Sequence, residues 1–202
     1  MGATVLYMSM SLDGFIAGPN VRPDNGLGDG GERLHEWVLT GDPHPGRGVP
    51  AVVATGVNGR IVAEFMSTGA VVAGRGTFEP ANGWGGDHHD GVPIFIYSRR
   101  PAAIDISCWP LVSYHDDVVE AFGRARAAAG DRTVLVHGAA TAQAALAAGL
   151  LDELELHVVP VLLGRGRRLF DHLPAAQIEL ERTRVLQGED GVTHLHYRVQ
   201  RA

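Results

Sequence analysis

Residues 134–161 read VLVHGAATAQAALAAGLLDELELHVVPV and contain the signals that decide the fold. The β-branched run at 134–137 predicts a strand, and Gly138 marks a tight turn directly after it. The small-residue segment that follows has helical character, and the alternating run at 153–161 predicts a second strand. A strand, a helix and a strand in this order indicate a right-handed crossover between parallel strands.

Strand and helix signals alternate along the rest of the chain, which closes on a hairpin at 178–199 with GEDG at its turn. No linker composition or internal repeat divides the chain, so one domain is expected over residues 1–202. The expected fold class is α/β, with a central, mainly parallel sheet, helices on both faces and an antiparallel C-terminal hairpin. Further strands are expected at 3–12, 70–74, 92–98 and 111–115, and further helices at 32–41, 58–69 and 116–130.

Glycines set the ends of two of these helices. Gly41 is expected to end the first helix and Gly130 the third, because glycine is favoured just past a helix C-terminus. In the third helix, Val119, Phe122 and Ala125 are expected to face the core.

Composition narrows the class of partner. The 202 residues carry a formal net charge of −6 and no basic stripe interleaved with aromatics, so nucleic acid is not expected as a partner. No apolar stretch approaches the roughly 18 residues that span a bilayer, and no signal peptide is evident, so a cytoplasmic protein is expected. The single cysteine, Cys108, rules out an internal disulfide.

Histidine is abundant, with ten residues in the chain, and this raises the question of a metal site. No three or four candidate ligands follow a spacing that would close such a site, so no metal is expected. His194 and His196 alternate with apolar residues on the last strand, and this pattern is typical of a solvated strand face.

Three strand ends have residues suited to a phosphorylated ligand. In an open α/β sheet, ligands collect where parallel strands end, because loops and helix N-termini converge there. Glycine lets a backbone approach a phosphate, and arginine adds a planar cation. The three strand ends are Gly74-Arg75-Gly76-Thr77, Ser98-Arg99-Arg100 and Gly138 to Thr141.

Each strand end also has a plain structural interpretation. A glycine after a strand is usually only a turn, and Arg99 with Arg100 is more often a solvated strand end. Neither the G-x-G-x-x-G fingerprint nor the P-loop motif occurs in the chain. The case for a cofactor therefore depends on three such ends following one another on parallel strands.

Four segments together carry a family resemblance. The chain resembles the dihydrofolate-reductase-like family, and within it most resembles the riboflavin-biosynthesis reductase domain and its stand-alone bacterial relatives. The resemblance implies a three-layer fold, an NADPH-dependent reductase and, as is common in that branch, a homodimer. The segments are YMSMSLDGFIAGPN (7–20), VVAGRGTFE (71–79), IFIYSRR (94–100) and the stretch from Val134 to Phe170.

The resemblance also implies a role for each strand end. Three residues at and after the first strand would line the nicotinamide, and the first glycine turn would hold pyrophosphate and adenosine. The second strand end would face the 2′-phosphate, and the Gly138 turn the pyrophosphate. The nicotinamide residues would be Ser9, Ile16 and Ala17, and the residues at pyrophosphate and adenosine would be Gly74, Arg75 and Thr77. The residues facing the 2′-phosphate would be Ser98 and Arg99. The Gly138 turn consists of Gly138, Ala139, Ala140 and Thr141. Relatives often have a cis peptide at the position of Gly138-Ala139, and the sequence leaves its geometry open.

Two departures from the family leave the substrate open. Riboflavin-pathway relatives have a lysine where this chain has Tyr7, and no acidic residue aligns with the carboxylate that dihydrofolate reductases use. Glu32 is the candidate proton donor, whereas Asp13 is interpreted as a turn residue. The expected activity is hydride transfer from NADPH to a small heterocycle of the pterin or aminopyrimidine type. The alternative is an NADP(H)-binding protein without turnover, such as a redox sensor or binding module.

Overall fold

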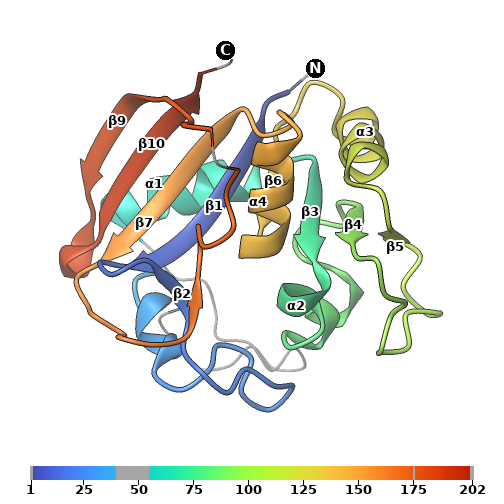
Figure 1. Cartoon of the computed structure of the whole chain (residues 1–202), viewed down its shortest axis with the longest axis horizontal. Helices are drawn as coiled ribbons and strands as arrows, with labels where there is room; N and C mark the ends of the chain where they lie inside the picture. The colour runs from blue at the N-terminus through green and yellow to red at the C-terminus, as the bar shows by residue number, and fades with distance from the viewer. Residues whose placement is uncertain (1, 40–54, 175, 201–202) are drawn as a thin grey trace.

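An eight-stranded sheet forms the centre of the computed structural model, which describes residues 2–39, 55–174 and 176–200 (Figure 1). Its strand order is β5-β4-β3-β6-β1-β7-β10-β9. The six strands from β5 to β7 run parallel, and β10 and β9 follow as antiparallel neighbours. The strands are β1 (Thr4–Ser11), β3 (Ala70–Gly74), β4 (Ile94–Tyr97), β5 (Val112–His115), β6 (Val134–His137), β7 (Glu153–Val159), β9 (Leu180–Gln187) and β10 (Thr193–Val199).

Helices cover both faces of this sheet. Figure 1 shows α4 (Ala139–Ala147) in front of the sheet and α1 (Gly56–Met66) behind it. The helix α3 (Val118–Ala129) shares a core with α4, whereas the short helix α2 (Arg75–Phe78) follows β3. The remaining elements are a two-stranded sheet of β2 (Phe15–Ala17) and β8 (Arg167–Arg168), and the 3₁₀ turns η1 (Gly31–Leu34), η2 (Asn82–Gly86) and η3 (Glu189–Gly191).

Alternation along β1 separates the two cores. Leu6 and Met8 pack into the core under α3 and α4, whereas Val5 and Tyr7 pack into the core on the opposite face. Successive side chains of a strand point to opposite faces, so a strand that is apolar on both sides belongs in the middle of a three-layer fold. The expected α/β class, with its mainly parallel sheet and antiparallel C-terminal hairpin, is therefore confirmed.

Two local expectations were wrong. The segment expected to be a helix at 32–41 forms only the 3₁₀ turn η1 and further turns over 35–38, and Gly41 lies outside the described residues. Gly30 precedes η1 with a left-handed backbone and no side-chain cap, so nothing favours a longer helix there. In α3, Val119 is 58% exposed. The helix begins at Val118, two residues later than expected, and Val118 rather than Val119 packs against the core.

No helix among the described residues is long and apolar enough to cross a membrane.

The parallel strands β3, β4 and β6 all end at the lower edge of the sheet in Figure 1, near α2. Three segments that lie far apart in the sequence therefore meet at one edge, as the crossover topology predicts.

Candidate functional site

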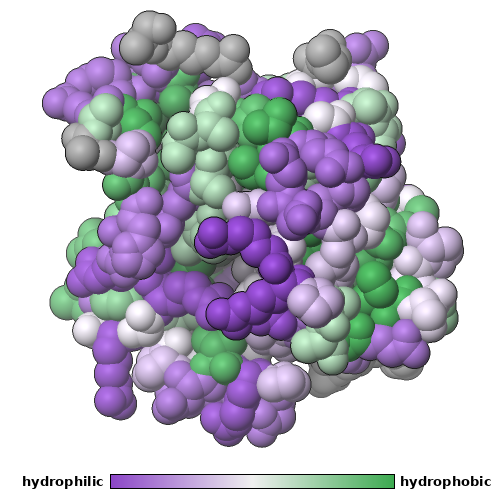
Figure 2. Space-filling model, turned by 45° about the vertical axis from the view of Figure 1, so that its right-hand side comes forward, coloured by the Kyte–Doolittle hydropathy of each residue, from purple (hydrophilic) through white to green (hydrophobic). Residues whose placement is uncertain are grey.

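A hollow of about 450 Å³ lies where β3 and β4 end beside α4. Figure 2 shows strongly hydrophilic side chains gathered around a hollow on this side of the molecule. All three predicted strand ends contribute to it, since five of the residues predicted to bind the cofactor line it: Gly74, Arg75, Ser98, Arg99 and Ala140. The other lining residues are Gly76, Tyr97, Arg100, Gln143, Ala144, Ala147 and His172.

The turn after β4 presents two guanidinium groups. Ser98 Oγ accepts a hydrogen bond from the Arg100 N–H at 3.1 Å and donates to the Arg100 carbonyl at 2.8 Å, which fixes the turn. Arg99 and Arg100 are exposed, and neither forms an ion pair with a carboxylate among the described residues. Both cations are therefore available to an anionic ligand in the hollow.

Arg75 is held in place by a carboxylate beneath it. Its Nη1 lies 3.1 Å from Glu79 Oε2, one helical turn along the chain. The other oxygen, Glu79 Oε1, accepts from the Ala103 N–H at 2.7 Å and from the Tyr114 hydroxyl at 3.3 Å. Because Glu79 has these further partners, it fixes the Arg75 side chain while part of the guanidinium, with 27% of the side chain exposed, remains open to a ligand.

Two glycine turns approach each other closely behind the hollow. Gly138 has a φ of 92°, and a Cβ on it would collide with Thr77 Oγ1. A Cβ on Gly74 would lie 2.9 Å from Thr141 Oγ1, closer than real Cβ contacts. Only glycine fits at both positions, so the backbones of the two turns can come together.

The N-terminus of α4 supplies hydrogen-bond donors to this region. The first intrahelical bond runs from the Ala142 N–H to the Gly138 carbonyl at 3.0 Å, so the N–H groups of 139–141 have no acceptor within the helix. Thr141 Oγ1 is buried and has no partner among the described residues. A helix N-terminus with free N–H groups beside a glycine turn fits a phosphate group. The described residues contain no cis peptide, so the Gly138–Ala139 bond is trans.

The predicted nicotinamide residues lie outside the hollow. Ser9 is buried on β1 on the face opposite α4, and its Oγ accepts a hydrogen bond from Trp37 Nε1 at 2.9 Å. Ile16 and Ala17 are buried on β2, which contacts β1 and η1. The prediction that these three residues contact the nicotinamide remains a prediction.

The two acidic candidates differ in their surroundings. Glu32 is exposed on η1 and does not line the hollow. Asp13 accepts from Ser11 Oγ at 2.6 Å and from the N–H groups of Leu163 and Gly164 at 3.1 and 2.7 Å. The hydrogen bond from Ser11 is the largest of the causes that hold the pKa of Asp13 below its usual range. Asp13 therefore ties the loop after β1 to the loop after β7, as its interpretation as a turn residue implies.

Sequence reasoning missed part of the lining. Gln143, Ala144 and Ala147 follow Ala140 at spacings of three, four and seven residues, so they share one face of α4. This helical periodicity could have identified them once the strand end before α4 was recognised. His172 comes from the segment after β8, and nothing in its local sequence indicates a role at the hollow.

Comparisons with solved structures agree with this architecture. A protein of Shewanella sp. PV-4 whose name places it in riboflavin biosynthesis is 24% identical, with a TM-score of 0.71 over 98% of this chain and 99% of that chain. Dihydrofolate reductase from Enterococcus faecalis, complexed with NADP(H) and RAB-propyl, is 16% identical, with a TM-score of 0.58 over 99% and 98% of the two chains. Acinetobacter baumannii RibD is 19% identical, with a TM-score of 0.57, and this chain spans 59% of its length.

At these identities the solved structures show the fold, which is dihydrofolate-reductase-like. No match to the chain is found among curated proteins. The family model of the RibD C-terminal domain matches residues 4–194, which is nearly the whole chain. The chain therefore belongs to the family of the RibD C-terminal domain.

Proposed function

We propose that this protein is an NADPH-dependent reductase that transfers hydride to a small heterocycle of the pterin or aminopyrimidine type. The observation that carries the proposal is the hollow at the ends of β3 and β4, where Arg75, Arg99 and Arg100 meet the N-terminal turn of α4. A cluster of guanidinium groups beside free backbone N–H groups is suited to a ligand with several phosphates. Membership of a reductase family agrees with this choice.

Different residues of the hollow would bind different phosphate groups of NADPH. Ser98 and Arg99 would hold the 2′-phosphate, because a hydroxyl and an exposed guanidinium there suit a terminal phosphate. The N–H groups of 139–141 and the fixed Arg75 would hold the pyrophosphate. When bound, NADPH supplies the hydride; the protein supplies orientation and a site that excludes water.

Glu32 is the proposed proton donor. Its turn, η1, packs on β1 and β2, which contain the predicted nicotinamide residues Ser9, Ile16 and Ala17. If Glu32 protonates the substrate, Glu32→Gln lowers turnover and leaves NADPH affinity unchanged. An equal loss of turnover and NADPH affinity would assign Glu32 a structural role instead.

The names of related proteins support the proposed substrate class. A pyrimidine reductase-like protein of Corynebacterium diphtheriae is 13% identical to this chain, with a TM-score of 0.63. The match covers 100% of this chain and 93% of the Corynebacterium protein. Together with the dihydrofolate reductase, it supports a ring substrate whose C=N or C=O carbon accepts hydride.

The proposal is tested by NADPH binding followed by turnover. NADPH fluorescence is titrated with protein, and oxidation is then measured against panels of pterins and aminopyrimidines. Saturable binding and oxidation with one panel are expected. Binding without oxidation of any substrate would favour an NADP(H)-binding module, and no binding would overturn both functions. Arg198→Ala is a matched control, because Arg198 lies on β10 in an exposed ion pair away from the hollow.

A further inference from the structure

A cluster of buried titratable side chains lies on the opposite face of the sheet, beneath α1. Glu155 and His157 share one face of β7, and His194 on the antiparallel strand β10 is the register partner of His157. One potential ligand atom from each residue lies within 4.8 Å of the others. All three residues are buried, with 0%, 4% and 1% of their surface exposed. The prediction of a solvated face is therefore wrong for His194.

The two histidines have ring nitrogens that face each other. Nδ1 of His157 lies 2.9 Å from Nδ1 of His194. Nε2 of His194 lies 2.9 Å from Asn58 Oδ1, and Asn58 Nδ2 donates to the Trp37 carbonyl at 3.3 Å. Because the amide nitrogen is used by Trp37, Asn58 presents its oxygen, and His194 must carry its proton on Nε2. This leaves the Nδ1 lone pair of His194 directed at His157.

This arrangement is the one that metal-binding histidines use. A ligating imidazole usually donates its other N–H to a carbonyl or carboxylate, which fixes the tautomer and the ring orientation. Asn58 does this for His194.

Glu155 supplies a third potential ligand. Its Oε2 accepts from Arg184 Nη2 at 3.0 Å, whereas its Oε1 is buried and has no partner among the described residues. A buried carboxylate oxygen without a partner is costly and needs an explanation, and a bound ion is one. A metal ion bound by Glu155 would give the free oxygen a partner and would replace the hydrogen bond between the two histidine rings.

Further acidic side chains lie beside the cluster. Arg184 Nη2 lies 2.7 Å from Glu64 Oε2 and 3.0 Å from Glu155 Oε2. His196 Nε2 lies 3.3 Å from Glu153 Oε2.

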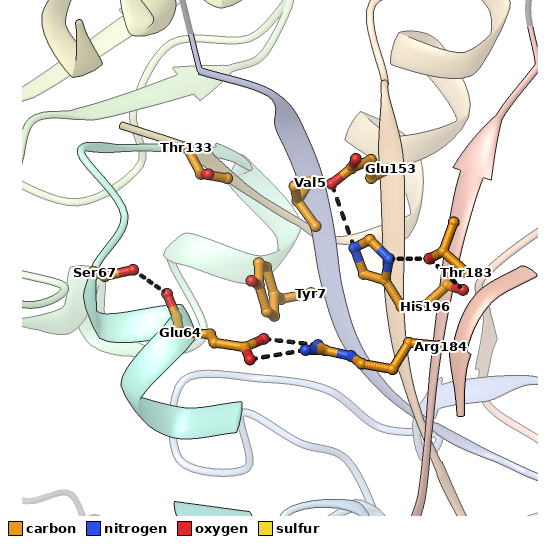
Figure 3. Close-up of a pocket in the computed structure, with 9 residues that line it drawn as sticks. All are labelled: Val5, Tyr7, Glu64, Ser67, Thr133, Glu153, Thr183, Arg184 and His196. Carbon is orange, nitrogen blue, oxygen red and sulfur yellow. Dashed lines mark hydrogen bonds and ion pairs between the residues drawn. The ribbon is translucent and has the colours of Figure 1, made fainter. Parts of the chain in front are cut away.

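A pocket of about 390 Å³ lies beside the cluster, and its lining includes Glu64 and Arg184. Figure 3 shows Arg184 reaching from β9 toward Glu64 on α1, with Tyr7 of β1 and His196 of β10 also lining the space. Tyr7 and His196 are the register partners of Glu155 on its two sides. The pocket therefore lies next to Glu155, which is itself fully buried.

We propose that Glu155, His157 and His194 form a binding site for a divalent transition-metal ion of the zinc class. Two imidazole nitrogens and one carboxylate oxygen are a ligand set that zinc accepts, with a fourth position left for water. At a Zn–N distance of about 2.0–2.1 Å, tetrahedral geometry needs the two nitrogens about 3.3 Å apart, so the 2.9 Å pair must widen slightly. The site ties β7 to β10 and is independent of the cofactor hollow.

The test begins with the wild-type chain after removal of metal by a chelator. Titration with Co²⁺ is expected to give the absorption of a four- or five-coordinate ion at one equivalent per chain, and Zn²⁺ is expected to displace it. The thermal midpoint should rise with metal concentration, because the ion binds only the folded state. An absorption spectrum like that of aqueous Co²⁺ with no thermal shift would overturn the proposal.

Variants then locate the ion. His157→Gln, His194→Gln and Glu155→Gln are each expected to weaken metal binding at least tenfold, whereas His115→Gln on β5 is the control and should bind like wild type. Unchanged binding in the two histidine variants of the site would overturn the assignment. If the variants do not fold, X-ray absorption of the zinc-loaded wild type decides. Two imidazole nitrogens support the site, and a coordination shell without them contradicts it.

Discussion

Gly138 and Thr77 lie in contact at the junction of two strand ends, so that a Cβ on Gly138 would collide with Thr77 Oγ1. This contact joins the β3–α2 turn to the β6–α4 turn, the two glycine turns behind the proposed cofactor hollow. Since Gly138 also has a φ of 92°, both the backbone and the space there require glycine.

Gly138→Ala is predicted to destabilise the protein and to weaken NADPH binding. The change adds a strained backbone and a steric clash, for a loss of roughly 2–4 kcal/mol in the free energy of unfolding. Gly149→Ala is the matched control, because Gly149 has a φ of 64° at the other end of α4 with nothing within 4 Å of a Cβ. Urea unfolding should show a loss of only about 1 kcal/mol for Gly149→Ala. Equal losses would show that the contact with Thr77 is unimportant.

Arg184→Met is predicted to be strongly destabilising. Arg184 makes two bonds to Glu64, at 2.8 and 2.7 Å, and one to the fully buried Glu155. Its loss leaves a buried carboxylate without its cation, at a cost of about 3 kcal/mol. Arg198→Met removes an exposed ion pair with Glu181 on the same hairpin and should cost less than about 1 kcal/mol. Similar unfolding midpoints for the two variants would contradict this difference.

His137 is predicted to make folding sensitive to acid. Its Nδ1 donates to the Tyr7 carbonyl at 2.9 Å, and burial lowers its pKa to about 4. The unfolded chain takes up a proton near pH 6.5 and the folded chain does not, so this contribution to stability is complete above that pH. It is lost as the pH falls toward 4. Between pH 7.5 and 5 the loss should be about 2 kcal/mol.

His137→Gln separates this contribution from those of the other buried histidines. Glutamine can still donate to the Tyr7 carbonyl but does not titrate. In denaturant unfolding at the two pH values, the variant should lose about 2 kcal/mol less than the wild type. An identical pH dependence would show that folding leaves the pKa of His137 unchanged, and would contradict the prediction.

The sequence predicted the sheet well because its central strands are nearly continuous apolar runs. Residues 70–74 and 134–137 are such runs, and both are buried strands in the structure. The three strand ends were also found, because glycine and arginine follow the strands directly. Local patterns were less reliable where packing decides, as at η1, where Leu34 and Trp37 are buried without a full helix.

The histidine cluster could not be predicted from spacing. Glu155 and His157 are two residues apart on β7, but His194 meets them only through the antiparallel pairing of β10 with β7. The alternation of His194 with Leu195 is the same whether the polar face is open to water or covered. Here α1 covers it, with Asn58 at the N-terminal end of the helix against His194.

The most direct test of the proposed function is the cofactor selectivity of Arg99→Ala. If Arg99 contacts the 2′-phosphate, the variant should bind NADPH at least tenfold more weakly and bind NADH almost as the wild type does, because only NADPH has that phosphate. Arg198→Ala should change neither affinity. Dissociation constants for both nucleotides are measured by fluorescence titration. An equal loss for NADPH and NADH, or no loss for either, would contradict the assignment of the hollow as an NADPH site.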